Sequence, residues 1–173
     1  LLAETMEGYR NLVKIVSKAS TEGMLYRPRA DRDLLRQYSK GIIALSACIQ
    51  GEIPQYILQD NMEGAKRSIE WYIETYGKDN FFLEIQNHGL PEEAKAQEEL
   101  IKLSKEYGLG IVASNDFHYV LKEDADAQDM KVCISTGRRR AEVDRLKFPN
   151  DEFYLKSGDE MAELFGHIPG AIE

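Results

Sequence analysis

The chain has few cysteines and no long apolar run. Its two cysteines, Cys48 and Cys133, are too few for the disulfide framework of a small secreted domain. A reducing cytoplasm is therefore the expected location. No run approaches the about 18 apolar residues of a membrane-spanning helix, and residues 1–20 carry charges throughout, unlike a signal peptide. No membrane partner is expected.

The chain also has no surplus of positive charge. It carries 22 Lys and Arg against 30 Asp and Glu, a net charge of −8. A dedicated duplex-binding module needs clustered basic residues for phosphate contacts, so this class is disfavoured. The local basic group Arg138–Arg140 indicates a solvated loop, with a phosphate contact as the alternative. Its 173 residues, 43% of them hydrophobic, fit a single domain over residues 1–173.

Nucleotide-binding and nucleophile motifs are missing too. The glycines are too scattered for a phosphate-binding loop or a dinucleotide fingerprint, and there is no nucleophile elbow. What the chain does contain is three short apolar runs, near 41–47, 80–86 and 110–115. Runs of this length bounded by turn residues indicate buried strands of a mostly parallel sheet.

Helical patterns separate these runs. Apolar spacing and capping residues predict helices at 7–19, from Asp31 through Tyr38, at 53–58, from Asp60 to Tyr76, from Pro91 to Tyr107, at about 123–136 and after Ser157. Residues 26–29 are expected to form a loop, and 138–150 an irregular stretch. Alternating strands and helices predict an α/β fold with parallel crossovers. Three strands cannot close a barrel, so part of a β/α barrel and a small open sheet both remain possible.

Candidate site residues follow the strands. Cys48 comes after the first, Glu84 and His88 lie in and after the second, and Asp116 and His118 follow the third. Ligands and catalysis concentrate at the carboxyl ends of parallel strands, so these positions are expected to meet on one face. A thiolate, carboxylates and imidazoles suit zinc, manganese or iron. Metal-assisted hydrolysis of a phosphate ester is the natural chemistry.

Each candidate also has a purely structural interpretation. Cys48 would then be a small buried hydrophobe, and Glu84 would pair with a basic neighbour. His88 would cap the next helix or pack in a turn. Asp116 would cap a turn, with His118 half-buried beside it. Two further residues are expected to be structural, Cys133 in the core and His167 on the surface.

Five segments together are more specific than their spacing. They are GYRNLVKIVS (8–17), GIIALSACIQGE (41–52), NFFLEIQNHGL (80–90), SNDFHY (114–119) and DEFYLKS (151–157). In this order the chain resembles the PHP (polymerase and histidinol phosphatase) domains of bacterial replicative DNA polymerase III alpha subunits. Segment 151–157 favours the polymerase group over a free-standing phosphatase.

The resemblance implies a partial, distorted (β/α)7 barrel with divalent metals, zinc or manganese, at the strands' carboxyl ends. It implies Cys48, Asp116 and His118 as metal ligands, and leaves Glu84 and His88 as neighbours of the site. In some members this site supports a 3′–5′ exonuclease. In others the domain is structural and binds a separate proofreading subunit. DNA, the sliding clamp and a magnesium-dependent polymerase centre belong to the parent protein.

This sequence departs from the family pattern at both ends. The family's first ligands, a His-x-His pair, would precede Leu1, and the polymerase palm would follow Glu173. The chain is therefore expected to be a fragment that neither polymerises nor holds the full metal cluster. An open sheet edge, left by missing first strands, is a template for pairing with another copy. Self-association or a rearranged fold is expected.

Overall fold

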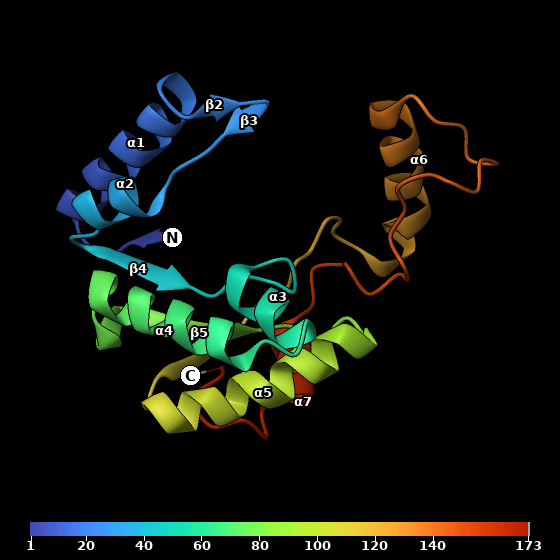
Figure 1. Ribbon diagram of the computed structural model, residues 1–173. Coiled ribbons are helices and arrows are strands. Elements are labelled where there is room, and N and C mark those ends of the chain that lie inside the picture. The colour runs from blue at the N-terminus through green and yellow to red at the C-terminus, as the bar shows by residue number, and fades with distance from the viewer. Residues whose placement is uncertain (173) are drawn as a thin grey trace.

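A computed structural model describes residues 1–172. Its centre is a four-stranded sheet in the order β1-β4-β5-β6 (Figure 1). The strands are β1 (Leu2–Ala3), β4 (Ile42–Leu45), β5 (Phe81–Ile85) and β6 (Gly110–Ala113). β4, β5 and β6 pair in parallel, as the apolar runs predict, and β1 pairs antiparallel with β4. The α/β class and the three parallel strands are confirmed.

The helices connect these strands. They are α1 (Met6–Thr21), α2 (Arg32–Gln37), α3 (Glu52–Leu58), α4 (Met62–Tyr76), α5 (Pro91–Tyr107), α6 (Ala125–Thr136) and α7 (Gly158–Phe165), with short 3-10 turns η1 (Lys78–Asn80) and η2 (Lys122–Asp124). β4 reaches β5 through α3 and α4, and β5 reaches β6 through α5. This is the strand–helix alternation that parallel pairing requires.

Local sequence sets the helix ends. Asp31 caps α2 by accepting a hydrogen bond from the Leu34 amide, and Ser157 with Glu160 forms the capping box of α7. α5 stops at Gly108, whose φ of 62° is the left-handed conformation that glycine adopts without strain. One expected cap is wrong. Asn61, rather than Asp60, accepts from the Gly64 amide at the start of α4.

Two further differences concern residues near the amino end. The expected loop at 26–29 contains a tight antiparallel pair, β2 (Met24–Leu25) with β3 (Arg27–Pro28). From the sequence no strand is expected before residue 41, whereas β1 pairs with β4 and forms one edge of the sheet. Within residues 1–172 the sheet has four strands and does not close into a barrel. In the same range no helix has the length and apolar character needed to cross a membrane.

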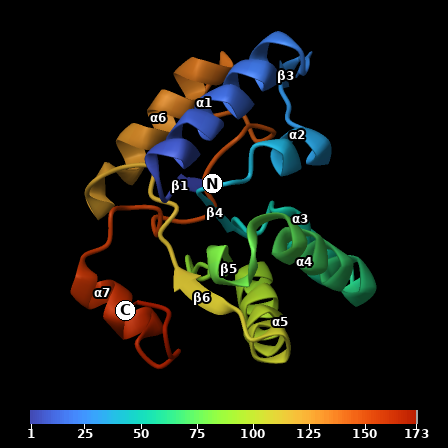
Figure 2. The same ribbon diagram turned by 90° about the vertical axis from the view of Figure 1, so that its left-hand side faces the viewer.

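The core lies on the sheet face covered by α3, α4 and α5 (Figure 2). Alternate strand residues point into it and are fully buried, among them Ile42, Ala44, Phe81, Leu83 and Ile85. This alternation follows from the period of two in a strand. The packed face fixes the register of the strands, and hence which residues stand at their carboxyl ends.

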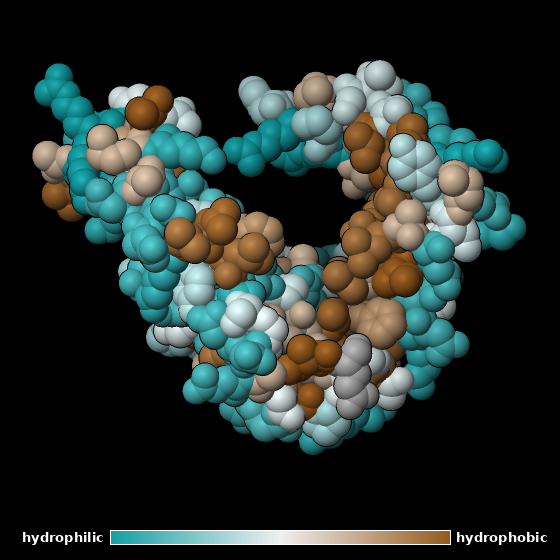
Figure 3. All heavy atoms as spheres, turned by 180° about the vertical axis from the view of Figure 1, so that it is seen from behind, coloured by the Kyte–Doolittle hydropathy of each residue, from teal (hydrophilic) through white to brown (hydrophobic). Residues whose placement is uncertain are grey.

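The opposite sheet face is a shallow apolar groove of about 420 Å³. Ile43, Leu45, Phe82 and Val112 line it from the strands, and the chain near Ala171 closes one side. Figure 3 shows hydrophobic side chains gathered along this hollowed face. The Ala113 amide donates to the Ala171 carbonyl at 2.8 Å, so the carboxyl-terminal segment packs beside β6.

α6 and residues 137–150 extend away from the sheet (Figure 1). The stretch after α6 is irregular, as expected, and returns along the helix. Arg145 forms a two-pronged ion pair with Asp129 at 2.5 and 2.8 Å, and Arg140 pairs with Asp126. Two expectations hold nearby, because Cys133 is buried and Arg138–Arg140 are exposed. Bidentate geometry makes the Arg145 pair the main polar link of this extension.

Candidate metal-binding edge

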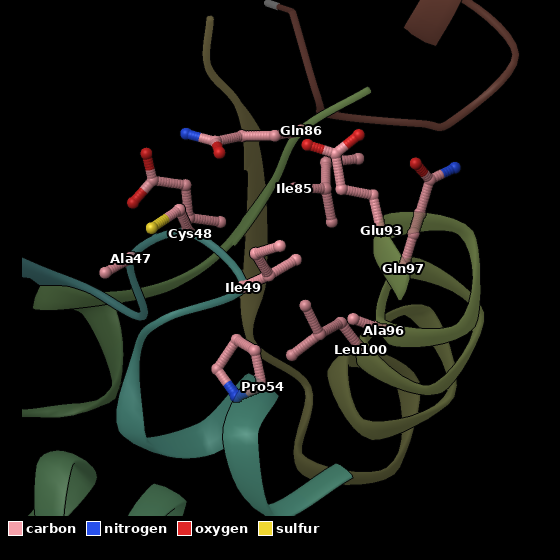
Figure 4. A pocket seen from close by; sticks show the side chains of 11 residues that line it. Ala47, Cys48, Ile49, Pro54, Ile85, Gln86, Glu93, Ala96, Gln97 and Leu100 are labelled. Carbon is pink, nitrogen blue, oxygen red and sulfur yellow. The ribbon is translucent and has the colours of Figure 1, made fainter. Parts of the chain in front are cut away.

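Cys48 lies in the loop that follows β4, and its side chain is half-buried. It lines a small pocket together with Glu84. Figure 4 shows Gln86 on one side of this pocket and Glu93 and Gln97 from α5 on the other. The free space is about 10 Å³, close to the smallest cavity that holds one water molecule. This pocket therefore has no room for a substrate.

Glu84 stands on β5 next to the end of β6. Its carboxylate accepts a short hydrogen bond from the Ser114 hydroxyl, and its backbone amide donates to the Ser46 hydroxyl at 2.8 Å. Gln86 donates to the same Ser114 oxygen at 2.9 Å. Polar side chains therefore tie the carboxyl ends of the three parallel strands together. A basic partner for Glu84, one of the structural interpretations, does not occur among the ion pairs of residues 1–172.

His88 follows β5 and is 1% exposed. Its Nδ1 lies 2.7 Å from Glu93 Oε1, and its backbone amide donates to Glu93 Oε2 at 2.6 Å. Its Nε2 lies 3.3 Å from Asn115 Oδ1, and the ring stacks on Phe153 at 4.3 Å between centroids. Its burial and contacts agree with one of its two structural interpretations, in which His88 packs in a turn. With both ring nitrogens engaged, His88 is not a free metal donor.

Glu93 is the acidic partner of His88, in the first turn of α5 and only 5% exposed. Burial pushes the pKa of Glu93 upward, but hydrogen bonds and charge attraction from His88, with the Leu90 amide, lower that pKa below its ordinary value. The carboxylate form is therefore the stabilised one. A buried carboxylate is tolerated when it is paired and hydrogen-bonded in this way.

Asp116 and His118 lie side by side beyond β6. His118 Nε2 is 3.3 Å from Asp116 Oδ1, and the two side chains are 41% and 46% exposed respectively. The expected closeness is present, but the backbone between the two residues is a tight turn rather than extended, because the Phe117 amide donates to the Asn115 carbonyl at 2.8 Å. The two groups are open to solvent, unlike His88. We call residues 114–118, which carry both groups, the donor loop.

Aromatic side chains and backbone hydrogen bonds hold the donor loop from one side. The His118 ring contacts Phe148 at 4.7 Å and Phe153 at 6.2 Å between centroids. The His118 amide donates to the Phe153 carbonyl at 2.8 Å. Asn115 Nδ2 donates to the Tyr154 carbonyl, also at 2.8 Å. Segment 148–154, distant in sequence, therefore fixes the loop that carries the candidate donors.

The donor atoms present are of the kind that binds a metal ion, but there are too few of them for a complete site. Asp116 offers carboxylate oxygens and His118 an imidazole, both suited to zinc or manganese. Residues 1–172, however, contain no group of three or more His, Cys, Asp or Glu placed to hold a metal ion. Cys48 and Glu84 line a separate pocket. The described chain therefore supplies two adjacent donors rather than a complete centre.

The sequence does not indicate the roles of two residues, Glu93 behind the donor loop and Asn115 within it. In the sequence, Glu93 is only an acidic residue in the first turn of a helix, and the helix dipole favours acidic residues at that position. Its position five residues after His88 is a weak signal. The His88–Glu93 contact forms only when the turn after β5 brings the start of α5 back against His88, so spacing alone does not reveal it. His167 is exposed, as expected.

The family model for the PHP domain matches residues 1–88, half of the chain. The chain belongs to the PHP domain family. Three relatives, each named DNA polymerase III subunit alpha, come from Borreliella burgdorferi, Treponema pallidum and Thermus aquaticus. They are 48%, 46% and 47% identical to the chain over 173, 172 and 164 residues. The resemblance noted from five segments is thus confirmed over the whole chain.

The chain spans only a small part of these relatives. The three proteins align with 100%, 99% and 95% of this chain. The aligned regions make up only 15%, 15% and 13% of their own lengths. The strong similarity therefore concerns one region of a much longer polymerase subunit.

Proposed function

We propose that the chain is the PHP region of a bacterial DNA polymerase III alpha subunit, acting in the cytoplasm. In this proposal Asp116 and His118 contribute to a divalent-metal site for 3′–5′ phosphodiester hydrolysis, with Cys48 as a further ligand. The observation that carries it is the adjacent, solvent-open Asp116–His118 pair at the carboxyl edge of a parallel sheet. Such an edge is where α/β folds place their ligands.

The remaining metal donors belong, in this proposal, to other parts of the polymerase subunit. This assignment agrees with the finding that residues 1–172 contain no group of three or more potential ligands. A bound zinc or manganese would supply an activated water and polarise a phosphoryl oxygen. The partners are DNA, the sliding clamp and a proofreading subunit, and the parent polymerase centre uses magnesium.

A second candidate function is structural. The domain would support the polymerase and bind a proofreading subunit without chemistry of its own. The same two-donor count favours it, because the described residues hold no complete centre. In that case the Asp116–His118 pair contributes little, since exposed ion pairs are worth about 0–1 kcal/mol.

The test uses a DNA polymerase III alpha subunit containing this chain. Asp116→Ala and His118→Ala are each expected to lower 3′–5′ exonuclease activity with Mn²⁺ more than about 100-fold. Removing a group that only supports a ligand already costs about 10–100-fold. Release of 3′-terminal nucleotides from a labelled primer measures this rate.

His167→Ala is the matched control, because it removes an exposed imidazole far along the chain from the donor loop. DNA synthesis by each variant checks that the protein is folded. Unchanged exonuclease rates in both donor variants would reject the metal-site proposal in favour of the structural one.

A further inference from the structure

A chain of hydrogen-bonded polar groups leads from α5 into the donor loop. It runs from Glu93 on α5 through His88 to Asn115 in the loop itself. Glu93 and His88 are 5% and 1% exposed. Burying such groups costs free energy unless every donor and acceptor is paired. We therefore expect these groups to do more than stabilise the turn at His88.

The hydrogen-bond partners show which atoms of these side chains face one another. Asn115 Nδ2 donates to the Tyr154 carbonyl at 2.8 Å, so Asn115 Oδ1 is the amide atom that faces the His88 ring. An amide oxygen only accepts, and the carboxylate of Glu93 only accepts. The His88 ring therefore donates through Nδ1 to Glu93, and its Nε2 lies 3.3 Å from Asn115 Oδ1.

The other side of His88 is held as firmly. Asn150 Nδ2 donates to the His88 carbonyl at 2.7 Å, and Phe153 stacks on the ring with an interplanar angle of 3°. The Phe153 carbonyl in turn accepts from the His118 amide at 2.8 Å. His88 is thus connected to the donor loop by two routes, through Asn115 before Asp116 and through Phe153 to His118.

We propose that Glu93, His88 and Asn115 form a positioning unit that sets the backbone of the donor loop. His88 is a positioning residue in this unit and does not bind metal. By holding Asn115 and Phe153, it fixes the residues on both sides of Asp116 and orients the two candidate donors. The significance for metal binding rests on the proposed function. The positioning itself does not, and can be measured without metal.

A merely stabilising pair would behave differently. Its loss would weaken the whole fold, and amide protection would fall evenly through β5, β6 and the donor loop. A positioning unit acts locally. Its loss would free the donor loop while the parallel strands, which are held by backbone pairing and the core under α4 and α5, keep their protection.

The test is residue-resolved amide hydrogen exchange on this chain. His88→Phe retains an aromatic ring that stacks on Phe153 but donates no hydrogen bond. It is expected to lower protection of the His118 amide at least about tenfold, the factor equal to losing one hydrogen bond to a charged group. Amides of β5 and β6 are expected to stay within about twofold of the parent chain. His167→Phe, the control, is expected to change neither.

Asn115→Ala provides a second variant that leaves the buried His88–Glu93 pair in place, should His88→Phe fail to fold. It is expected to produce the same local loss at His118. Unchanged His118 protection in a folded variant, or an even loss through the strands, would overturn the proposal.

Mn²⁺ affinity of the polymerase subunit separates this inference from the proposed function. Absence of metal binding in the unmodified protein would reject the proposed function and leave the exchange result standing. If the unmodified protein binds Mn²⁺, His88→Phe is expected to weaken binding about 10–100-fold, as loss of a ligand's supporting group does. An unchanged affinity would overturn the link between His88 and the donors.

Discussion

Gly8→Ala is expected to destabilise this chain by at least about 3 kcal/mol, at the upper end of what overpacking costs. Gly8 lies in the first turn of α1, directly against the turn at Gly41 that begins β4. A Cβ at Gly8 would overlap the Gly41 carbonyl oxygen and lie 2.5 Å from its carbonyl carbon. Both are backbone atoms, so no side-chain rotation relieves the clash.

The same turn is fixed by other contacts. The Gly41 carbonyl accepts from the Glu4 amide at 2.9 Å, and the Lys40 carbonyl accepts from the buried Asn11 side chain at 3.0 Å. Moving the turn to admit a methyl group would break these bonds. The better helix propensity of alanine returns only about 1 kcal/mol.

Urea unfolding measures the effect, and Gly158→Ala is the control. Gly158 is also a first-turn helix glycine, but a Cβ there meets nothing within 4 Å. It is expected to change the free energy of unfolding by about 1 kcal/mol or less. Equal stabilities for the two variants would show that α1 does not pack on β4 as described.

Phe81→Ala is expected to cost about 3–5 kcal/mol, the range for removing a buried aromatic ring. Phe81 begins β5, is fully buried and stacks on Tyr72 of α4 at 4.9 Å between centroids. Few groups are placed to fill the cavity, because the surrounding core is bounded by the sheet and α4. This loss reaches the lower end of the stability of a typical domain, about 5–15 kcal/mol.

The neighbouring ring provides the comparison. Phe82 points to the opposite face, where it is half-buried in the apolar groove. Phe82→Ala is expected to cost roughly 1–2 kcal/mol, since less apolar area returns to water. Denaturation midpoints of the two variants measure the difference. A larger loss for Phe82 would mean that the groove face, and not the face under α4, is the core.

The sequence predicts the parallel part of the fold well, for a physical reason. The strands near 41–47, 80–86 and 110–115 are short apolar runs, and the helices between them have apolar stripes with glycine stops at Gly77 and Gly108. Each signal is local and strong. By contrast, β1 is two residues long and has no periodicity, so only its pairing with β4 defines it.

Capping at α4 shows how local signals mislead. Asp60 and Asn61 are adjacent and both suit an N-cap. Asp60 adopts a φ of 57°, a left-handed conformation that ends the preceding turn, which leaves Asn61 to cap the helix. The choice depends on how the chain leaves α3, and sequence spacing does not encode that path.

The candidate site likewise contains some contacts that the sequence predicts and others that it does not. Asp116 and His118 are two residues apart, so the sequence predicts that they are close, and the structure has them 3.3 Å apart across a tight turn after β6. The placement of Cys48 depends on the path of a loop, and it lines a pocket with Glu84. The His88–Asn115 contact joins residues 27 apart through a buried ring, and nothing in composition or spacing indicates it.

The most direct test is the metal content of a purified DNA polymerase III alpha subunit containing this chain, measured by mass spectrometry beside its Asp116→Ala and His118→Ala variants. We expect bound zinc or manganese in the unmodified subunit and reduced content in both variants, because the two side chains supply adjacent donors. Equal metal content in all three proteins would contradict this expectation.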